Sequence, residues 1–208
     1  AYYNLGVLYF QQKKYDKAEE MYLKSIEETD DVNAYFNLGL LYSQEKKYDK
    51  AEEMFLKAAQ YGEKKAYYDL GVLYFQQKKY DKVEQMFLKA AQYGDVKAYY
   101  NLGVLYFQQK NYNKAEEMYL KAIKETDDIN AYNNLGTLYY EQKKYDKAEQ
   151  MYLQSIKRGN DMSYKGLGFV YYVQNRHSDA KKYLKIAADK GDQEAAGYYN
   201  ELLKAGYW

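Results

Sequence analysis

A Leu-Gly pair recurs six times along this chain of 208 residues, at intervals of 32 or 33 residues. The pairs are Leu5-Gly6, Leu38-Gly39, Leu70-Gly71, Leu102-Gly103, Leu135-Gly136 and Leu167-Gly168. Two further positions keep the same phase. A Tyr lies four residues after each Leu, and an Ala lies thirteen residues after each Leu, replaced once by Val83. A fixed period of this length indicates a repeat architecture, in which each unit packs mainly against its sequence neighbours.

Within each repeat the apolar residues follow a helical period twice. In residues 96–128, Tyr99, Leu102 and Tyr106 form one stripe, Ala115 and Met118 begin another, and a polar break at 108–111 separates them. So short a break predicts two antiparallel helices, and the absence of Pro from the chain leaves both uninterrupted. Helix N-caps are expected at Asp31, Asp95, Asp128 and Asp192.

The period divides the chain into six helical hairpins, at about 1–31, 32–63, 64–95, 96–128, 129–160 and 161–192. Residues 193–208 start like a further first helix, but Tyr199 and Asn200 stand where Leu-Gly would be. We expect this segment to be a C-terminal capping helix, which covers the apolar end of a stacked array. No cap precedes Ala1, and the chain starts inside a repeat, so we expect residues upstream to be missing. The fold class is therefore all-α, an α-solenoid.

The string Ala98–Tyr106, followed by Tyr112, Ala115, Tyr119 and Ala122, resembles the tetratricopeptide repeat. The resemblance recurs six times over residues 1–192, and it implies a right-handed superhelix whose first helices line a concave groove. Three repeat ends are similar to the related Sel1-like repeat: Ala58–Gly62, Ala90–Gly94 and Ala187–Gly191. The family usually has Gly in the hairpin turn, whereas Lys-Lys pairs such as 46–47 stand here. Because a left-handed non-Gly residue is uncommon, we expect these turns to be reshaped.

The composition and the chemistry-bearing residues exclude several functions. The 31 basic residues balance 30 acidic ones, and Arg158 and Arg176 are the only arginines, which argues against nucleic acid as a partner. No apolar run is long enough to span a membrane. With no Cys and with His177 as the single histidine, placed in a turn, we expect no metal site, no cofactor and no catalytic group. The compartment, cytoplasm or periplasm, is left open.

Binding residues are expected on the first helix of each repeat, on the face turned away from its partner helix. The residue before each Leu is Asn in four of the six repeats, which resembles the asparagine ladder of tetratricopeptide superhelices that hold an extended peptide. A carboxamide both donates and accepts, so it can pair with any peptide unit. A structural role for these Asn residues is the alternative, and the sequence favours neither. The candidate groove residues are Tyr3, Asn4, Phe36, Asn37, Lys65, Tyr68, Asp69, Lys97, Tyr100, Asn101 and Asn134.

The groove chemistry is expected to change along the chain. Repeats 1–4 place aromatic and aliphatic residues there, which predicts an apolar anchor, whereas Asn133, Thr137 and Lys165 replace them in repeats 5 and 6. Lys65 and Lys97 are expected to attract an acidic residue of the ligand. The carboxylate clamp of chaperone-tail binders is absent, because Tyr3, Val7 and Asp69 stand at its positions.

These observations favour a non-enzymatic scaffold that binds a protein or an extended peptide segment. A second hypothesis is a structural element that forms a homo-oligomer through the uncapped first repeat. A third is the recognition arm of a larger enzyme whose catalytic part lies outside these residues. RNA binding by helical repeats is the weakest alternative, because it needs a basic groove.

Overall fold

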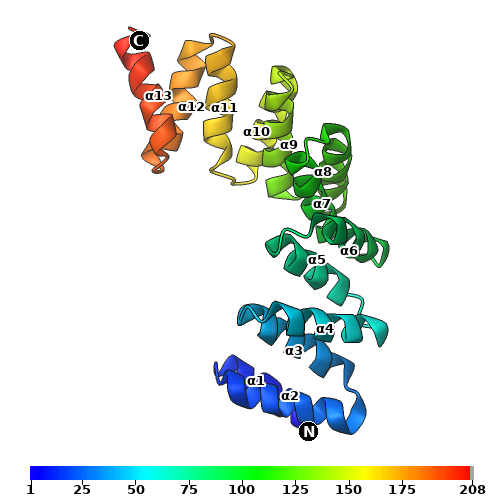
Figure 1. The fold of residues 1–208 in the computed structure, drawn as a ribbon. Coiled ribbons are helices and arrows are strands. Elements are labelled where there is room, and N and C mark those ends of the chain that lie inside the picture. The colour runs from blue at the N-terminus through cyan, green and yellow to red at the C-terminus, as the bar shows by residue number, and fades with distance from the viewer. Residues whose placement is uncertain (207–208) are drawn as a thin grey trace. The chain divides into compact units, whose positions relative to one another are not determined.

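A computed structural model of the chain describes residues 1–206, which form thirteen α-helices and contain no strand (Figure 1). The chain divides into two compact units, unit 1 at Ala1–Ala98 and unit 2 at Tyr99–Trp208. Six helical hairpins and a final helix make up this part of the chain, so the all-α solenoid class predicted from the Leu-Gly period is confirmed.

The helices have similar lengths in both units. Those of unit 1 are α1 (Tyr2–Gln11), α2 (Tyr15–Thr29), α3 (Val32–Gln44), α4 (Tyr48–Gln60), α5 (Ala66–Gln76) and α6 (Tyr80–Gln92). Helix α7 (Lys97–Gln108) begins at the end of unit 1. It is followed by α8 (Tyr112–Thr126), α9 (Ile129–Glu141), α10 (Tyr145–Lys157), α11 (Ser163–Val173), α12 (His177–Asp189) and α13 (Gln193–Lys204). All six hairpins bury the small residue of the second helix, and five bury the Leu of the Leu-Gly pair, whereas Leu5 is exposed.

The glycine of each Leu-Gly pair makes room for a large side chain of the second helix. A Cβ built on Gly39 would lie 2.7 Å from the ring of Phe55, and one on Gly103 would lie 2.5 Å from the ring of Tyr119. The residue sixteen positions after the glycine fills this space in every repeat, as Tyr22, Phe55, Phe87, Tyr119, Tyr152 and Leu184. The glycine thus sets how closely the two helices of a hairpin approach.

The hairpin turns keep the left-handed geometry although Lys occupies it. Lys46 has a φ of 60°. Its N–H donates to the carbonyl of Ser43, and that of Lys47 donates to the carbonyl of Tyr42. These two bonds are those of the Schellman motif, in which glycine is the usual left-handed residue. The expectation that the Lys turns are reshaped was therefore wrong. Left-handed residues stand at the same turn position in all six repeats: Lys13, Lys46, Lys78, Lys110, Lys143 and Asn175.

Replacing a left-handed Lys by Gly should stabilise the protein. Lys143 has a φ of 58°, and a side chain in this region costs about 1–2 kcal/mol, which the added freedom of Gly in the unfolded chain only partly offsets. We expect Lys143→Gly to raise the free energy of unfolding by up to about 1 kcal/mol in urea titrations. The matched control is Lys144→Gly, where φ is −88° and the unfolded-state cost stands alone. Equal effects of the two substitutions would contradict this account.

The second helices end in two ways, which explains the two repeat lengths. In the 33-residue repeats a left-handed Asp30 or Asp127 ends the helix, and the next Asp caps the following one. In the others a glycine of positive φ follows, at Gly62, Gly94, Gly159 and Gly191. The expected caps Asp31, Asp128 and Asp192 accept backbone N–H groups of α3, α9 and α13, and Asp95 accepts that of Lys97. Gly159 adds a fourth glycine ending to the three seen in the sequence.

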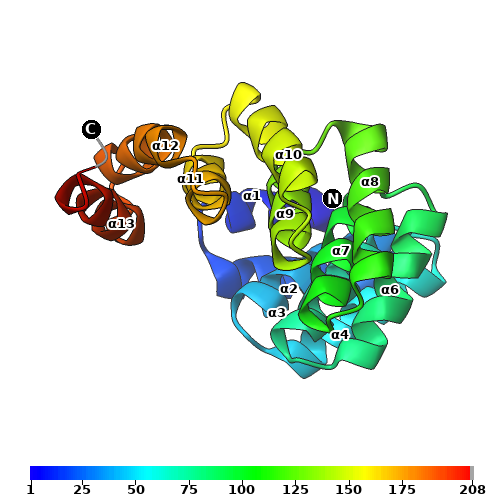
Figure 2. The ribbon, with the colours of Figure 1, turned by 90° about the horizontal axis from the view of Figure 1, so that it is seen from above.

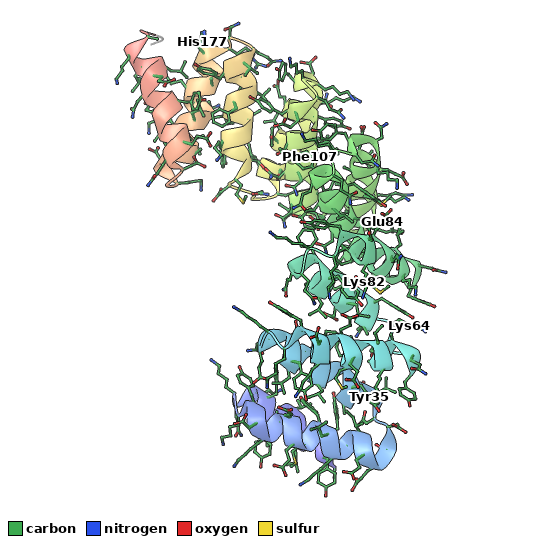
Figure 3. The ribbon with its side chains drawn as sticks, viewed as in Figure 1. Tyr35, Lys64, Lys82, Glu84, Phe107 and His177 are labelled. Atoms are coloured by element: carbon green, nitrogen blue, oxygen red, sulfur yellow. The ribbon has the colours of Figure 1, made fainter. Side chains whose placement is uncertain are left out.

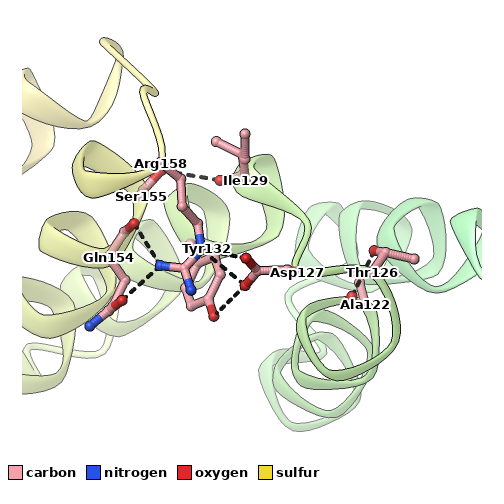
Figure 4. Close-up of polar contacts among 8 residues, drawn as sticks. All are labelled: Ala122, Thr126, Asp127, Ile129, Tyr132, Gln154, Ser155 and Arg158. Carbon is pink, nitrogen blue, oxygen red and sulfur yellow. Dashed lines mark hydrogen bonds and ion pairs between the residues drawn. The ribbon is translucent and has the colours of Figure 1, made fainter.

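Asp127 also ties two repeats of unit 2 together (Figure 4). Its carboxylate accepts Nε of Arg158 at 2.9 Å and the Tyr132 hydroxyl at 3.0 Å. These contacts, with the Arg158 hydrogen bond first, lower the pKa of Asp127. The guanidinium of Arg158 lies over the Tyr132 ring, 4.2 Å from its centroid. The charge of the guanidinium thus pairs with Asp127 and its planar face packs on Tyr132, both within the protein.

A second contact between repeats uses the Tyr four residues after each Leu. Tyr42 donates its hydroxyl to Glu19 of the preceding repeat at 2.7 Å, and Tyr74 donates to Glu52 at 2.8 Å. Lys82, labelled in Figure 3, reaches the same Glu52 at 3.1 Å. Unit 2 repeats the arrangement, with Tyr139 on Glu116 and Tyr171 on Glu149. Burial, followed by these acceptors, raises the pKa of each Tyr.

Helix α13 lies beside α12 at the C-terminal end of unit 2 (Figure 2). The ring of Tyr198 meets Phe169 edge-on at 4.9 Å and Tyr172 at 5.3 Å, and Leu202 is buried. No further helix follows within the described residues. Of the expected capping segment 193–208, Tyr207 and Trp208 lie outside them.

Candidate functional site

In unit 1, aromatic residues and an amide meet on the first-helix face of neighbouring repeats. Tyr3 of α1 packs against Tyr22, with ring centroids 6.2 Å apart. Its hydroxyl accepts Nδ2 of Asn37, on α3, at 3.0 Å. The expected ladder residue Asn37 is therefore bonded to the aromatic residue of the preceding repeat. Asn4, which has no repeat before it among the described residues, is exposed.

Unit 2 contains the same contact. Tyr100 of α7 packs against Tyr119 at 6.2 Å, and its hydroxyl accepts Nδ2 of Asn134, on α9, at 3.2 Å. Asn101 is half-buried on α7. Each carboxamide is therefore oriented by a hydroxyl of the preceding repeat, and Oδ1 of Asn134 also accepts Nδ2 of Asn133 at 3.3 Å. The sequence placed these residues on one face, but it gave no sign that Tyr and Asn of successive repeats bond.

Asp69 replaces the amide of this contact, and the hydroxyl is missing as well. It occupies the ladder position on α5, and the residue of the preceding repeat that would supply the hydroxyl is Phe36, whose ring packs against Phe55 at 5.8 Å. Burial, followed by the charges of Asp95 and Glu63, raises the pKa of Asp69 to about 6, while Lys97 opposes the shift. The carboxylate thus sits where an amide would be tolerated better.

Lys65 and Lys97 line one cavity of about 440 Å³ in unit 1, at the ends of two successive repeats. Glu63 and Asp95 also line it, and each accepts the backbone N–H of the Lys two residues later. The expected basic pair is therefore brought together, among acidic caps rather than alone. Tyr68, on α5, packs against Phe87 at 5.6 Å.

Repeats 5 and 6 surround a second cavity, of about 310 Å³, within unit 2. Asn133, Thr137 and Lys165, the residues that break the sequence pattern, all line it. Tyr152 and Met162 line it as well. Sequence reasoning missed these two, because Tyr152 fits the core pattern of the repeat and Met162 lies in a connection. The available signal was Gly166, which stands where four other repeats have Asn.

The residues with chemistry outside these faces are engaged in ordinary contacts. Arg176 pairs with Glu149 at 2.9 Å and lies over the Tyr171 ring at 4.1 Å. His177 was expected as an exposed turn residue, but it is the first residue of α12 and half-buried, with its ring near that of Tyr172. Residues 1–206 contain no group of three His, Asp or Glu side chains that could hold a metal ion. None of the helices in that range is long and apolar enough to cross a membrane.

Comparison with protein families gives matches over most of the chain. A family model described as Tetratricopeptide repeat matches residues 1–64 and 95–161, and another with the same description matches residues 64–93. No curated protein matches the chain.

Solved structures with similar folds share little sequence with the chain. PilF of Pseudomonas aeruginosa has 22% identity and a TM-score of 0.78, with 96% of each chain covered. YrrB, described as a TPR protein with an unusual peptide-binding site, has 22% identity and a TM-score of 0.70, covering 86% of this chain and 97% of YrrB. A protective antigen of uropathogenic Escherichia coli with an SLR fold has 22% identity and a TM-score of 0.78; 99% of this chain covers 49% of it. At these identities the likeness concerns the fold.

Proposed function

The chain belongs to the tetratricopeptide repeat family, and from this premise we propose that it binds an extended peptide segment of a partner protein along the first-helix face of its repeats. Repeat proteins of this fold are generally non-catalytic scaffolds for protein interaction. We propose the same for this chain, with no catalytic group, metal or cofactor. The partner is a protein, not a nucleic acid.

The observation that carries the proposal is the hydroxyl–amide contact found in both units. Tyr3 holds Nδ2 of Asn37, and among the described residues nothing donates to Oδ1 of Asn37. That oxygen is left to accept an N–H group from a bound backbone, whereas Oδ1 of Asn134 would exchange the long bond from Asn133 for one from the ligand. Fixing the amide beforehand reduces the ordering cost that binding an extended peptide otherwise incurs. Peptide binding by YrrB, noted above, agrees with this use of the fold.

The remaining candidate residues supply selectivity rather than backbone contacts. Tyr3, Phe36, Tyr68 and Tyr100 offer aromatic area at low entropic cost. Asp69 would favour a basic side chain on the ligand, and Lys65 with Lys97 an acidic one. A ligand with both charges, spaced along its length, would use all three residues.

The test is selection from a displayed library of random peptides against the chain. We expect enriched peptides whose affinity falls at least tenfold for Asn37→Ala or Asn134→Ala, with unchanged helicity by circular dichroism. Matched controls are Glu53→Gln and Glu117→Gln, whose carboxylates pair with Lys57 and Lys121 on the second helices. No enrichment, or affinity untouched by the two Asn substitutions, would overturn the proposal.

Self-assembly is a second candidate, because α1 exposes two leucines of the apolar stripe that recurs in each repeat. Leu5 is 41% exposed and Leu8 46%, whereas their equivalents Leu38 and Leu41 are fully buried. Sedimentation velocity over a hundredfold range of concentration distinguishes this reading, since a constant monomer mass excludes it. The third reading, a recognition arm of a larger enzyme, keeps the same groove and places the chemistry in another part of the protein.

A further inference from the structure

The cavity lined by Asn133, Thr137 and Lys165 in unit 2 exists because the repeat pattern changes around it. The position that holds Tyr or Phe in repeats 1–4 holds Asn133 in repeat 5, so no aromatic ring covers Tyr152 there. At the ladder position of the next repeat stands Gly166, and a Cβ on it would lie 2.4 Å from Cζ of Tyr152. The end of the Tyr152 ring therefore occupies the space of the missing Asn. A volume of about 310 Å³ is left beside it, between α9 and α11.

The polar groups of the cavity are mostly paired with one another. The hydroxyl of Tyr152 lies 3.0 Å from Oγ1 of Thr137, and Oδ1 of Asn133 accepts the Ser163 hydroxyl at 2.8 Å. Lys165 pairs with Asp192 and with Glu194, each at 3.1 Å. A charged ligand group would have to break these pairs, which is costly in a partly buried site.

Apolar and aromatic surface is what the cavity offers instead. Tyr140 and Phe169 line it, and Phe169 is held edge-on by Tyr198 at 4.9 Å. Met162 also lines it, and with 72% of its surface exposed it is the most exposed large hydrophobic residue of the described chain. A thioether packs well against an aromatic ring and adapts its shape to it.

We propose that this cavity binds an aromatic side chain of the partner peptide. The inference rests on the proposed peptide-binding function and names the residue class that the C-terminal repeats select. An aromatic side chain buries on the order of 150–250 Å² and gains from ring–ring contacts with offset or edge-on geometry. Three features fit it: the cavity volume, the ring pair on its walls and the flexible Met162 at its edge.

The first test uses a small probe, N-acetyl-L-tryptophanamide, with nuclear magnetic resonance of 13C-methyl methionine in the whole chain. We expect the Met162 methyl signal to shift with millimolar probe, and the other five methionines to stay in place. N-acetyl-L-leucinamide and N-acetyl-L-argininamide should bind at least fivefold more weakly. Equal or tighter binding of the arginine probe would overturn the aromatic assignment, because Glu141 at the cavity would then be the attractive group.

Variants test the cavity itself. Asn133→Tyr restores the residue of repeats 1, 3 and 4 and should abolish the shift by filling the space above Tyr152. Should that variant fold poorly, Phe169→Leu keeps apolar volume but removes one aromatic wall, and affinity should fall at least threefold. The control is Val104→Thr, which places in repeat 4 the residue that repeat 5 has at the equivalent position, Thr137. This variant should leave the titration unchanged. A shift that persists in both Asn133→Tyr and Phe169→Leu would overturn the proposal.

The displayed library separates this inference from the proposed function. Enriched peptides should contain an aromatic residue, and Asn133→Tyr should lower their affinity at least tenfold. Peptides that depend on Asn37 but not on Asn133 or on an aromatic residue would overturn the cavity proposal and leave the scaffold proposal standing. Probe binding without any enriched peptide would overturn the scaffold proposal and leave the cavity as a site for an aromatic group.

Discussion

Asp69→Asn is expected to stabilise the chain at pH 7, by up to about 3 kcal/mol in the free energy of unfolding. Burial, with the charges of Asp95 and Glu63, raises the pKa of Asp69 from 3.8 to about 6, so at neutral pH the folded state holds an unfavourable carboxylate. The substitution places the neutral amide of the neighbouring repeats at this position. Phe36 stands opposite this position and has no hydroxyl, so the substitution breaks no hydrogen bond to it.

The sign of the pH dependence follows from the direction of the shift. Between about pH 4 and pH 6 the folded protein keeps the Asp69 proton more firmly than the unfolded chain does, so this group makes stability fall as pH rises through that window. The difference between Asp69→Asn and the parent should be small at pH 4 and nearly complete above pH 6.5. Lowered pKa values of Glu52 and Asp192 act in the opposite direction in both proteins and cancel in the difference.

Urea titrations at several pH values, followed by circular dichroism, measure this difference. Glu27→Gln, which removes an exposed carboxylate of α2, is the matched control and should change stability by less than about 0.5 kcal/mol at any pH. A stability difference for Asp69→Asn that is constant from pH 4 to pH 7 would contradict the account. If Asp69 weakens the fold in this way, its presence is consistent with the proposed binding of a basic ligand residue.

The fold could be predicted from the sequence because its determinants are local. The Leu-Gly spacing, the helical period and the caps at Asp31, Asp128 and Asp192 are all properties of one repeat. The prediction for the turns was wrong because it used residue type alone: Lys disfavours the left-handed conformation, yet Lys46 adopts it. The Schellman hydrogen bonds and the packing of the two helices hold it left-handed nevertheless.

The candidate site could be predicted only in part, because its contacts join residues of different repeats. The period places Tyr3 and Asn37 on equivalent faces, but their bond depends on how one hairpin stacks on the next. The Tyr42–Glu19 contact was missed for the same reason. The apolar anchor predicted for repeats 1–4 stays a prediction. The cavity of repeats 5 and 6 arises from Gly166, whose effect is visible only once Tyr152 occupies the space of the absent side chain.

Gly39→Ala is expected to destabilise the chain by about 1–3 kcal/mol, although Ala is the better helix former by about 1 kcal/mol. The added Cβ would lie 2.7 Å from two ring carbons of Phe55, a distance at which either the ring or the helix must move. Phe55 is 1% exposed and packs against Phe36, so its ring can move only if the two helices of the hairpin separate. The steric cost therefore exceeds the gain in helix propensity.

Gly197→Ala separates the two effects, because it keeps the propensity gain and removes the clash. Gly197 lies within α13, and a Cβ built there meets no atom within 4 Å. We expect this variant to gain about 0.5–1 kcal/mol in the same urea titration. Opposite signs for the two Gly→Ala substitutions would establish that the repeated glycine serves close packing and not helix flexibility. A stabilising Gly39→Ala would mean that Phe55 can repack, and the glycine of the Leu-Gly pair would then not be what sets the approach of the two helices.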